Sequence, residues 1–452
     1  MIATPAIRLP KVTEAAIGHP LTSNFLFNFY LLFVVVHFLR LSSRVPALGA
    51  MRITVLMVLV MVAGLIANKE QLRGRLASEP RKWLIALAVY IVLTLPLVKW
   101  PGSVLQITLQ VWILSTLFFF FTLLVVDSLP RLKTFVKVFF LCQIVRVLEP
   151  LFLHITQGYW GSRTYVGDGE FMARLAGGPH DVVNPNGLAF VIVSVVPFLA
   201  YLSIMAKWTG RTTKLLSFAI LGALIYALIL TSSRSGMLAL GVVIVAVFLK
   251  SKNKVLFVAV VIGGISVAMG GLNDLQRDRY LSIFSSDTRG AATADGRVQG
   301  LKDEVKLAMQ RPFFGHGLGT SGEAKYHFFG RFQVAHDLYT ELVIDLGIFG
   351  LILFLMFLRA TYHTVRDLRR KLAHMESLGE SDREYLRALT DAVEVWGLMC
   401  IFVSIAYFGL MEWHWYLIGG ISVAAARVVN VQTDTAETRK PKVRNAFRKQ
   451  TA

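Results

Sequence analysis

A histidine and an aspartate, His336 and Asp337, stand side by side directly before the apolar run 338–358. An imidazole titrates near neutral pH and can remove a proton from a hydroxyl group. Asp337, Glu341 and Asp345 recur every fourth residue, so they share one face of the following helix. We expect His336 to act as a general base and the carboxylates to pair with arginines. Two alternatives are open, His336 as an ordinary interfacial histidine and Asp337 as the helix cap.

Arginines and asparagines recur in other polar segments of the chain. These are Arg163 and Arg174 in GSRTYVGDGEFMARL, Asn184 and Asn186 in VVNPNGLAF, Arg234 in TSSRSGM and Arg297 in DGRVQG. A guanidinium group presents a planar fork of donors that suits diphosphate oxygens. Arg234 precedes Ser-Gly at a predicted helix start, where free backbone N–H groups also favour anions. We interpret these residues as contacts of an anionic substrate. The alternative for the arginines is that they pair with lipid phosphate or lie on a loop without a specific role.

Other candidates each have a structural explanation beside the functional one. The asparagines of Asn-Pro-Asn are also a good turn and helix-cap signal. His316 lies in PFFGHGLG, whose glycines are explained by backbone geometry at positive φ. Arg146 lies three residues before Glu149 in a predicted membrane span. It either pairs with Glu149 or serves a substrate, because ionisable groups at that depth are often functional.

The elements that position these residues are predicted to be membrane helices. The chain has 452 residues, of which 55% are hydrophobic, and its mean hydropathy is +0.58. Apolar runs of about 18 residues or more predict membrane helices. We predict about twelve, at 24–41, 51–67, 82–98, 104–126, 132–155, 187–206, 213–231, 235–250, 254–271, 338–358, 392–410 and 414–430. The predicted fold is an all-α polytopic membrane protein, with one integral membrane domain over residues 1–452.

The distribution of charge predicts the orientation of this domain. The net charge is +19, and alternate loops are basic, as the positive-inside rule requires of cytoplasmic loops. We therefore expect both termini inside, with a cytoplasmic loop at 361–391 and a basic tail at 431–452 that contacts anionic lipids rather than nucleic acid. The first residues lack the layout of a cleavable signal peptide, so the first span is expected to be an anchor. A long, partly helical outer loop, 272–337, ends with His336 and Asp337.

Several classes of protein and site are disfavoured. The sequence has no Walker loop, no GxSxG, no HExxH and no repeat of 20–50 residues. Its two cysteines, Cys142 and Cys400, fall inside predicted spans, which argues against a disulfide framework and a cysteine metal site. The outer loops hold no cluster of carboxylates that suits a divalent cation. We expect a reaction that needs no metal or other cofactor.

The order of these motifs resembles the O-antigen ligase and polymerase superfamily of bacterial inner membranes, and within it the O-antigen ligases. The motifs are NPNGLA, SSRSG, DGR, RPFFGHGLG and AHDLYTELVIDLGIFG, over about residues 170–360. Asp337 stands where asparagine is common in that family. The resemblance implies a GT-C-like membrane glycosyltransferase. Its donor would be a glycan on undecaprenyl diphosphate and its acceptor a hydroxyl of the lipid A–core oligosaccharide, at the periplasmic face of a Gram-negative inner membrane.

The same resemblance assigns roles to residues and leaves rivals open. It makes His336 the general base, Arg234 a diphosphate contact, and Arg174 and Arg297 further anion contacts. An O-antigen polymerase would use the same donor with a second lipid-linked glycan as acceptor, and a protein O-oligosaccharyltransferase would modify a serine or threonine. A twelve-span transporter or flippase is the alternative from another class, although the unusual polar residues gather outside rather than at mid-membrane.

Overall fold

The computed structural model describes most of the chain. The described residues are 22–72, 77–167, 169–250, 254, 276, 280, 291–335, 337–375, 378–406 and 409–439. The predicted span at 254–271 lies almost entirely outside them. Each of the other predicted spans coincides with a helix or with consecutive helical segments, because long apolar runs satisfy their backbone hydrogen bonds internally as helices.

The first half of the chain is helical throughout its apolar runs. Its elements are α1 (Asn24–Phe38), α2 (Leu41–Arg44), α3 (Pro46–Ala50), α4 (Ile53–Ala67), α5 (Lys69–Leu72), α6 (Glu79–Thr94), α7 (Pro101–Ser103), the π-helical η2 (Val104–Thr108), α8 (Leu109–Val125) and α9 (Leu129–Gln157). A β-hairpin of β1 (Gly161–Gly167) and β2 (Glu170–Leu175) follows α9. The hairpin lies in a segment expected only as an outer loop.

The second half contains the longest helices. Its elements are α10 (Pro185–Leu199), the π-helical η3 (Ala200–Ile204), α11 (Arg211–Leu230), α12 (Arg234–Lys250), α15 (Ala291–Gln310), α16 (Ser321–Phe329), α17 (Leu338–His374), α18 (Glu380–Val403) and α19 (Trp413–Arg439). The predicted cytoplasmic loop 361–391 is largely helical, because α17 continues to His374 and α18 begins at Glu380. Lysine, arginine and glutamate are good helix formers, so both helices continue beyond their apolar parts.

Among the described helices, five are long and apolar enough to cross a membrane. They are Pro101–Val125, Leu129–Gln157, Pro185–Ile204, Arg211–Leu230 and Leu338–His374. Two shorter apolar helices, Asn24–Phe38 and Ile53–Ala67, accompany them. These helices support the predicted all-α membrane class, while the count of twelve spans and the GT-C-like fold stay predictions.

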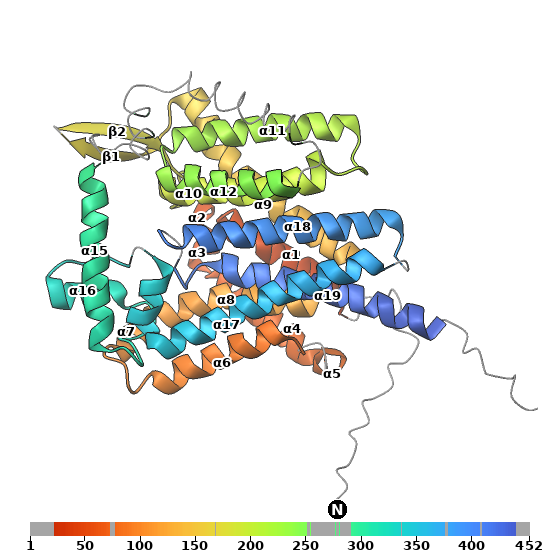
Figure 1. Ribbon diagram of the computed structural model, residues 1–452, viewed down its shortest axis with the longest axis horizontal. Coiled ribbons are helices and arrows are strands. Elements are labelled where there is room, and N and C mark those ends of the chain that lie inside the picture. The colour runs from red at the N-terminus through yellow and green to blue at the C-terminus, as the bar shows by residue number, and fades with distance from the viewer. Residues whose placement is uncertain are drawn as a thin grey trace, which may run out of the picture.

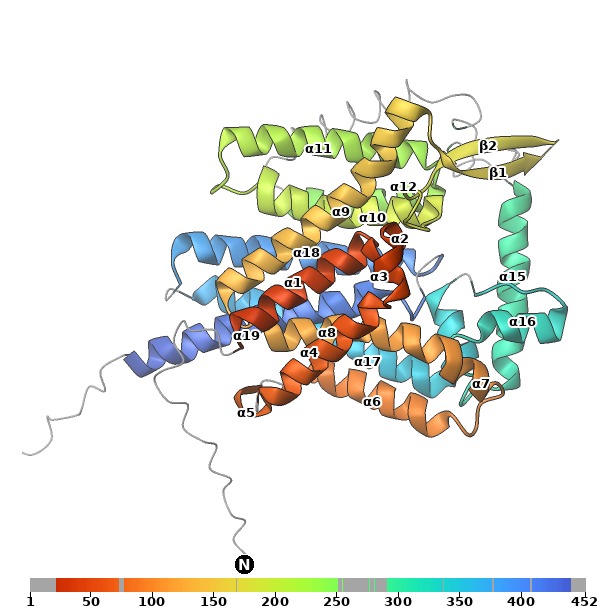
Figure 2. The ribbon, with the colours of Figure 1, turned by 180° about the vertical axis from the view of Figure 1, so that it is seen from behind.

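The long helices lie side by side and form one bundle (Figures 1 and 2). α17 packs against α6 and α19, and α19 packs against α8. Edge-on and tilted aromatic rings pack in the core, among them Phe38, Phe139, Trp396 and Trp413. Because one continuous core connects the helices, the two ends of the bundle keep fixed positions relative to each other.

The two ends of the bundle differ in character. At one end, on the left in Figure 1, lie the hairpin, α7, α15 and α16, and α15 runs across this end from the hairpin towards the start of α17. At the opposite end, basic residues of the expected cytoplasmic side form ion pairs with acidic residues of α18. These pairs are Lys133–Asp382, Lys207–Glu384, Lys250–Asp391 and Arg369–Asp391. The end with the hairpin is called the outer end below, after the sequence prediction.

Candidate active site

The predicted general base, His336, lies outside the described residues, but the chain on both sides of it is described. Ala335 donates its N–H to the hydroxyl oxygen of Ser321, 3.3 Å away. Leu338 donates its N–H to the carbonyl of Ser404 over 2.8 Å. The backbone that leads into and out of His336 is therefore attached to α16 on one side and to the end of α18 on the other.

Asp337 is the N-cap of α17, as the alternative reading predicted. Its carboxylate accepts hydrogen bonds from the backbone N–H groups of Tyr339 (3.0 Å) and Thr340 (2.9 Å). Burial raises the pKa of Asp337, and the nearby Glu304 carboxylate raises it further, although the hydrogen bonds from Thr340 and Tyr339 act in the opposite direction. The N-cap of α17 therefore binds a proton more tightly than an exposed aspartate does.

The expected pairing of the carboxylate stripe with arginines is wrong for the described residues. Asp345 accepts the N–H of Gly319 over 2.7 Å, and Glu341 accepts the N–H of Leu410. Asp345 is buried and Glu341 is half-buried, and both carboxylates meet loops that fold back against α17. Loops present free N–H groups, which the sequence pattern alone does not reveal as partners.

The segment PFFGHGLG and the start of α17 form one structural unit. α17 leaves helical conformation at Gly347, where φ is 68° and ψ is −173°. At this break, His316 donates its N–H to the Ile344 carbonyl (2.7 Å), and Ile348 donates to the Pro312 carbonyl (2.7 Å). The predicted span 338–358 is thus not one continuous helix. The loop 312–319 forms hydrogen bonds with backbone groups on both sides of the break and so compensates for the helical bonds that are lost there.

His316 is enclosed within this unit. Its side chain is 1% exposed, its ring stacks on Trp100 with centroids 5.6 Å apart, and its Nε2 lies 3.2 Å from the Leu307 carbonyl. Burial lowers the pKa of His316, and the charges of Arg311 and Lys99 lower it further. The geometry favours a neutral, packing imidazole, and the predicted substrate contact of His316 stays untested.

Arg174 joins the hairpin to the turn before α12. Its Nε donates to the Thr231 carbonyl (2.8 Å), its Nη2 to Asn186 Oδ1 (2.9 Å) and its Nη1 to Thr164 Oγ1 (3.4 Å). Asn186 Oδ1 also accepts the Ser233 hydroxyl over 2.9 Å. The structure therefore brings the predicted residues Arg174 and Asn186 together on the TSSRSG segment, where Arg174 is buried and braces the turn.

Arg234 is the first residue of α12, as predicted. The turn before it is unusual, because Ser232 has a φ of 48°, a left-handed conformation that non-glycine residues seldom adopt. Ser233 Oγ accepts the N–H of Gly236 over 3.2 Å and so caps the first turn of the helix. The strained turn and its cap fix Arg234 at a helix N-terminus, where the backbone favours anions.

The remaining candidates have different environments. Asn184 caps α10 by accepting the N–H of Gly187 (2.8 Å), which confirms the cap reading. Arg163 is exposed on β1. Arg297 lies on α15, and its side chain is outside the described part of the structure. Whether any of these contacts a substrate stays a prediction.

The suggested Arg146–Glu149 pair is replaced by a larger cluster. Arg146 binds Asp181 through two donors, Nε to Oδ2 at 2.7 Å and Nη2 to Oδ1 at 3.1 Å. Glu149 is instead held by both terminal nitrogens of Arg44. Successive turns of α9 present these two side chains to different neighbours, so proximity in sequence did not decide their partners.

Sequence reasoning missed several of these partners. Arg40, which also contacts Asp181 at 3.3 Å, lies at the end of the first predicted span, and Arg44 follows that span, both in the segment FLRLSSRVP. By the predicted topology that segment is an outer loop, so these two arginines also run against the positive-inside bias. That signal was available in the sequence. Nothing comparable marks the buried pair of Glu304 and Lys325.

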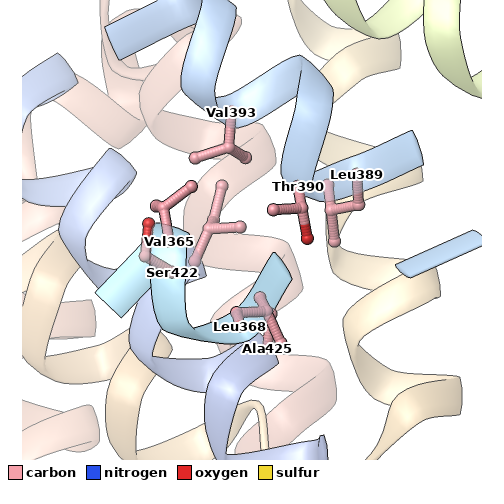
Figure 3. Close-up of a pocket in the computed structure, with 8 residues that line it drawn as sticks. Val365, Leu368, Leu389, Thr390, Val393, Ser422 and Ala425 are labelled. Carbon is pink, nitrogen blue, oxygen red and sulfur yellow. The ribbon is translucent and has the colours of Figure 1, made fainter. Parts of the chain in front are cut away.

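The apolar pocket in Figure 3 lies away from these candidates. Its lining comes from the last part of α17, from α18 and from α19: Val365, Leu368, Leu389, Thr390, Val393, Ile421, Ser422 and Ala425. Val365 is about 30 Å along α17 from Asp345, at 1.5 Å per residue. The candidate site is accordingly built from polar groups at the outer end and not from this pocket.

Two groups of candidates thus face the same end of the bundle. One is the turn of Arg234 with Arg174 and Asn186, and the other is the α16–α17 junction around His336; α15 runs between them in Figure 1. Within the described ranges, no three His, Cys, Asp or Glu residues are placed to hold a metal ion, and the metal-free reaction stays a prediction.

Comparison with known proteins concerns the same part of the chain. Residues 218–355 match the family model described as O-antigen ligase. The matched stretch begins in α11 and includes the Arg234 turn, α15, α16, the His336 segment and the break in α17. No curated protein matches the chain. Residues 218–355 are thus similar to the O-antigen ligase family, which is the family that the sequence motifs resemble.

Proposed function

We propose that this membrane protein is an O-antigen ligase that transfers a glycan from undecaprenyl diphosphate to a hydroxyl of the lipid A–core oligosaccharide. The family match supports a ligase or polymerase type of activity. The observation that carries the proposal is the fixed position of Arg234 at the N-terminus of α12, at the same end of the bundle as the His336 segment. A charged leaving group and a proton acceptor are the needs of glycosyl transfer.

The proposed reaction is a direct displacement. His336 takes the proton of the acceptor hydroxyl while its oxygen forms a bond to the anomeric carbon of the donor sugar. The bond between that carbon and the diphosphate oxygen breaks, and undecaprenyl diphosphate leaves with the bonding electrons. Attack from the opposite side inverts the anomeric centre.

Residues around the diphosphate would stabilise its developing charge. Arg234 and the positive end of the α12 dipole would attract the phosphate oxygens. Arg174 and Asn186 hold the turn in place, and Arg174 and Arg297 supply further positive charge near the anion. Because Arg174, Asn186 and the turn before Arg234 are fixed before the substrate arrives, little reorganisation of this turn is needed during the reaction.

The test is transfer by the purified protein from an undecaprenyl-diphosphate glycan to lipid A–core, with EDTA present. We expect a glycan-bearing core species that is lost in His336→Ala, while donor binding persists. Arg234→Ala should weaken donor binding by roughly 10- to 100-fold, because a hydrogen bond to a charged group contributes about 1.5–3 kcal/mol. Arg211→Ala, an exposed arginine at the other end of the bundle, is the matched control.

Other outcomes would assign a different function. Lengthening of the lipid-linked glycan without a change in the core would indicate a polymerase. Retained transfer in His336→Ala would remove the proposed base. Loss of activity on addition of EDTA would contradict the metal-independent mechanism.

A further inference from the structure

The outer end of the bundle contains a fully buried ion pair between Lys325 of α16 and Glu304 of α15. The lysine side chain is 0% exposed and the glutamate side chain 1%. The pair lies beside a small apolar cluster of Leu307, Ala308, Ala324 and Ile344. Removing both charges from water is costly, so a buried ion pair is weak evidence for added stability. Its position calls for another explanation.

Both members of the pair reach the segment that carries His336. Lys325 Nζ lies 3.5 Å from the carbonyl of Val334, two residues before it. Glu304 accepts the Thr340 hydroxyl over 2.7 Å, and the same hydroxyl contacts the Asp337 carboxylate. The pair is thus connected to the chain on either side of the predicted base.

A second ion pair between nearly the same segments is different in character. Arg331, at the end of α16, contacts Asp303, the neighbour of Glu304 on α15. The Arg331 side chain is 46% exposed, and exposed pairs contribute little to stability. Among the described residues, neither Arg331 nor Asp303 forms a hydrogen bond or an ion pair with the segment 334–340. Both pairs attach α15 to α16 or to the residues just after it, but only the Lys325–Glu304 pair also contacts the chain around His336. Comparing the two pairs therefore distinguishes an effect of this attachment from an effect on the His336 segment.

We propose that Lys325 and Glu304 are positioning residues for His336: they hold the segment Val334–Thr340 so that the imidazole meets the acceptor hydroxyl. This inference rests on the proposed role of His336. Proton transfer depends on geometry, and a displacement of about 1 Å can reduce a rate by roughly 100-fold. The pair acts on the base through the backbone and through Thr340, without touching the substrate.

The test compares two double variants of the full-length protein. Lys325→Met with Glu304→Leu removes both buried charges together, because removal of one leaves an uncompensated charge and endangers folding. Arg331→Gln with Asp303→Asn removes the exposed pair as the control. Transfer kinetics are measured for each, together with hydrogen–deuterium exchange of peptides that cover residues 332–340.

For the buried pair we expect kcat to fall roughly 10- to 100-fold with the donor KM unchanged. Exchange should increase in residues 332–340 and stay unchanged in α8 and α19. The control should keep kcat within about two-fold, as expected for an exposed pair.

Unchanged kcat and exchange in the buried-pair variant would overturn the proposal, and so would an equal loss in both variants. The exchange measurement does not depend on the reaction. If the unsubstituted protein shows no transfer, the proposed function fails, whereas the attachment of residues 334–340 is still decided by exchange.

Discussion

Asp337 shows how one residue can meet two requirements at once. It caps α17, and it shares the Thr340 hydroxyl with Glu304. A hydroxyl carries one proton, so it can donate to only one of two carboxylates at a time. The second contact is favourable when a carboxyl group is itself protonated, which agrees with the raised pKa of Asp337.

This arrangement predicts that Asp337→Asn is tolerated. Asparagine caps helices as well as aspartate does, and its amide can donate to Thr340 without a charge. We expect transfer within about three-fold of the parent, whereas Asp337→Ala should lose about 1 kcal/mol of stability with the cap.

The pH dependence of stability provides the measurement. A carboxyl group whose pKa is raised by folding stabilises the protein while it is protonated, and this contribution is lost as pH rises through the folded pKa. The unfolding temperature of Asp337→Asn should therefore increase relative to that of the parent as pH rises above the ordinary aspartate pKa of 3.8 towards neutrality. A difference in Tm that does not change with pH would count against the raised pKa.

At the scale of elements, the break in α17 is the feature that organises the site. The first part of the helix carries Asp337, Glu341 and Asp345, and the part after Gly347 crosses the bundle. The loop 312–319 fits into the break, with Gly315 and Gly347 both at a φ of 68°. The glycines of the motifs G-H-G-L-G and D-L-G-I-F-G are needed where these two distant segments meet, because Gly315 and Gly347 both adopt a positive φ there.

A side chain at the break should be poorly tolerated. A Cβ at residue 347 would overlap the carbonyl group of Phe313, and alanine disfavours a φ of 68°. We expect Gly347→Ala to destabilise the protein by about 1–3 kcal/mol or more and to reduce transfer. Gly222→Ala in α11 is the control, because a Cβ there meets no atom within 4 Å and alanine favours helix. Equal unfolding temperatures for the two variants would contradict this account.

The sequence predicted local features well and tertiary pairings poorly. The caps at Asn184 and Asp337 follow from bonds between a side chain and nearby backbone, so a few residues contain the signal. The partner of Arg146 could not be predicted in this way, because Asp181 is 35 residues away and is brought there by the fold. The break in α17 was hidden for the same reason: its hydrogen bonds come from a loop that precedes it in the chain.

At the scale of the whole molecule, both ends of the bundle hold ion pairs. The outer end holds buried or braced arginines such as Arg146 and Arg174, each bound to named acceptors. The other end holds partly exposed pairs such as Lys250–Asp391 and Lys133–Asp382. The outer end also holds the partly exposed pair Arg331–Asp303, and the buried pair Arg131–Asp127 lies at the start of α9. The burial of these pairs therefore does not orient the bundle, and the positive-inside topology stays a prediction.

The orientation can be tested with single cysteines and a maleimide that does not cross membranes. Val182 is 97% exposed at the outer end, and Thr212 is exposed at the start of α11 at the other end. The parent should give little background, because Cys142 and Cys400 are both buried. We expect Val182→Cys to be labelled in cells with a permeabilised outer membrane, and Thr212→Cys only after the inner membrane is opened. The reverse pattern would place the Arg234 turn and the His336 segment in the cytoplasm, where a periplasmic transfer to lipid A–core cannot occur, and the proposed function would fall with the topology.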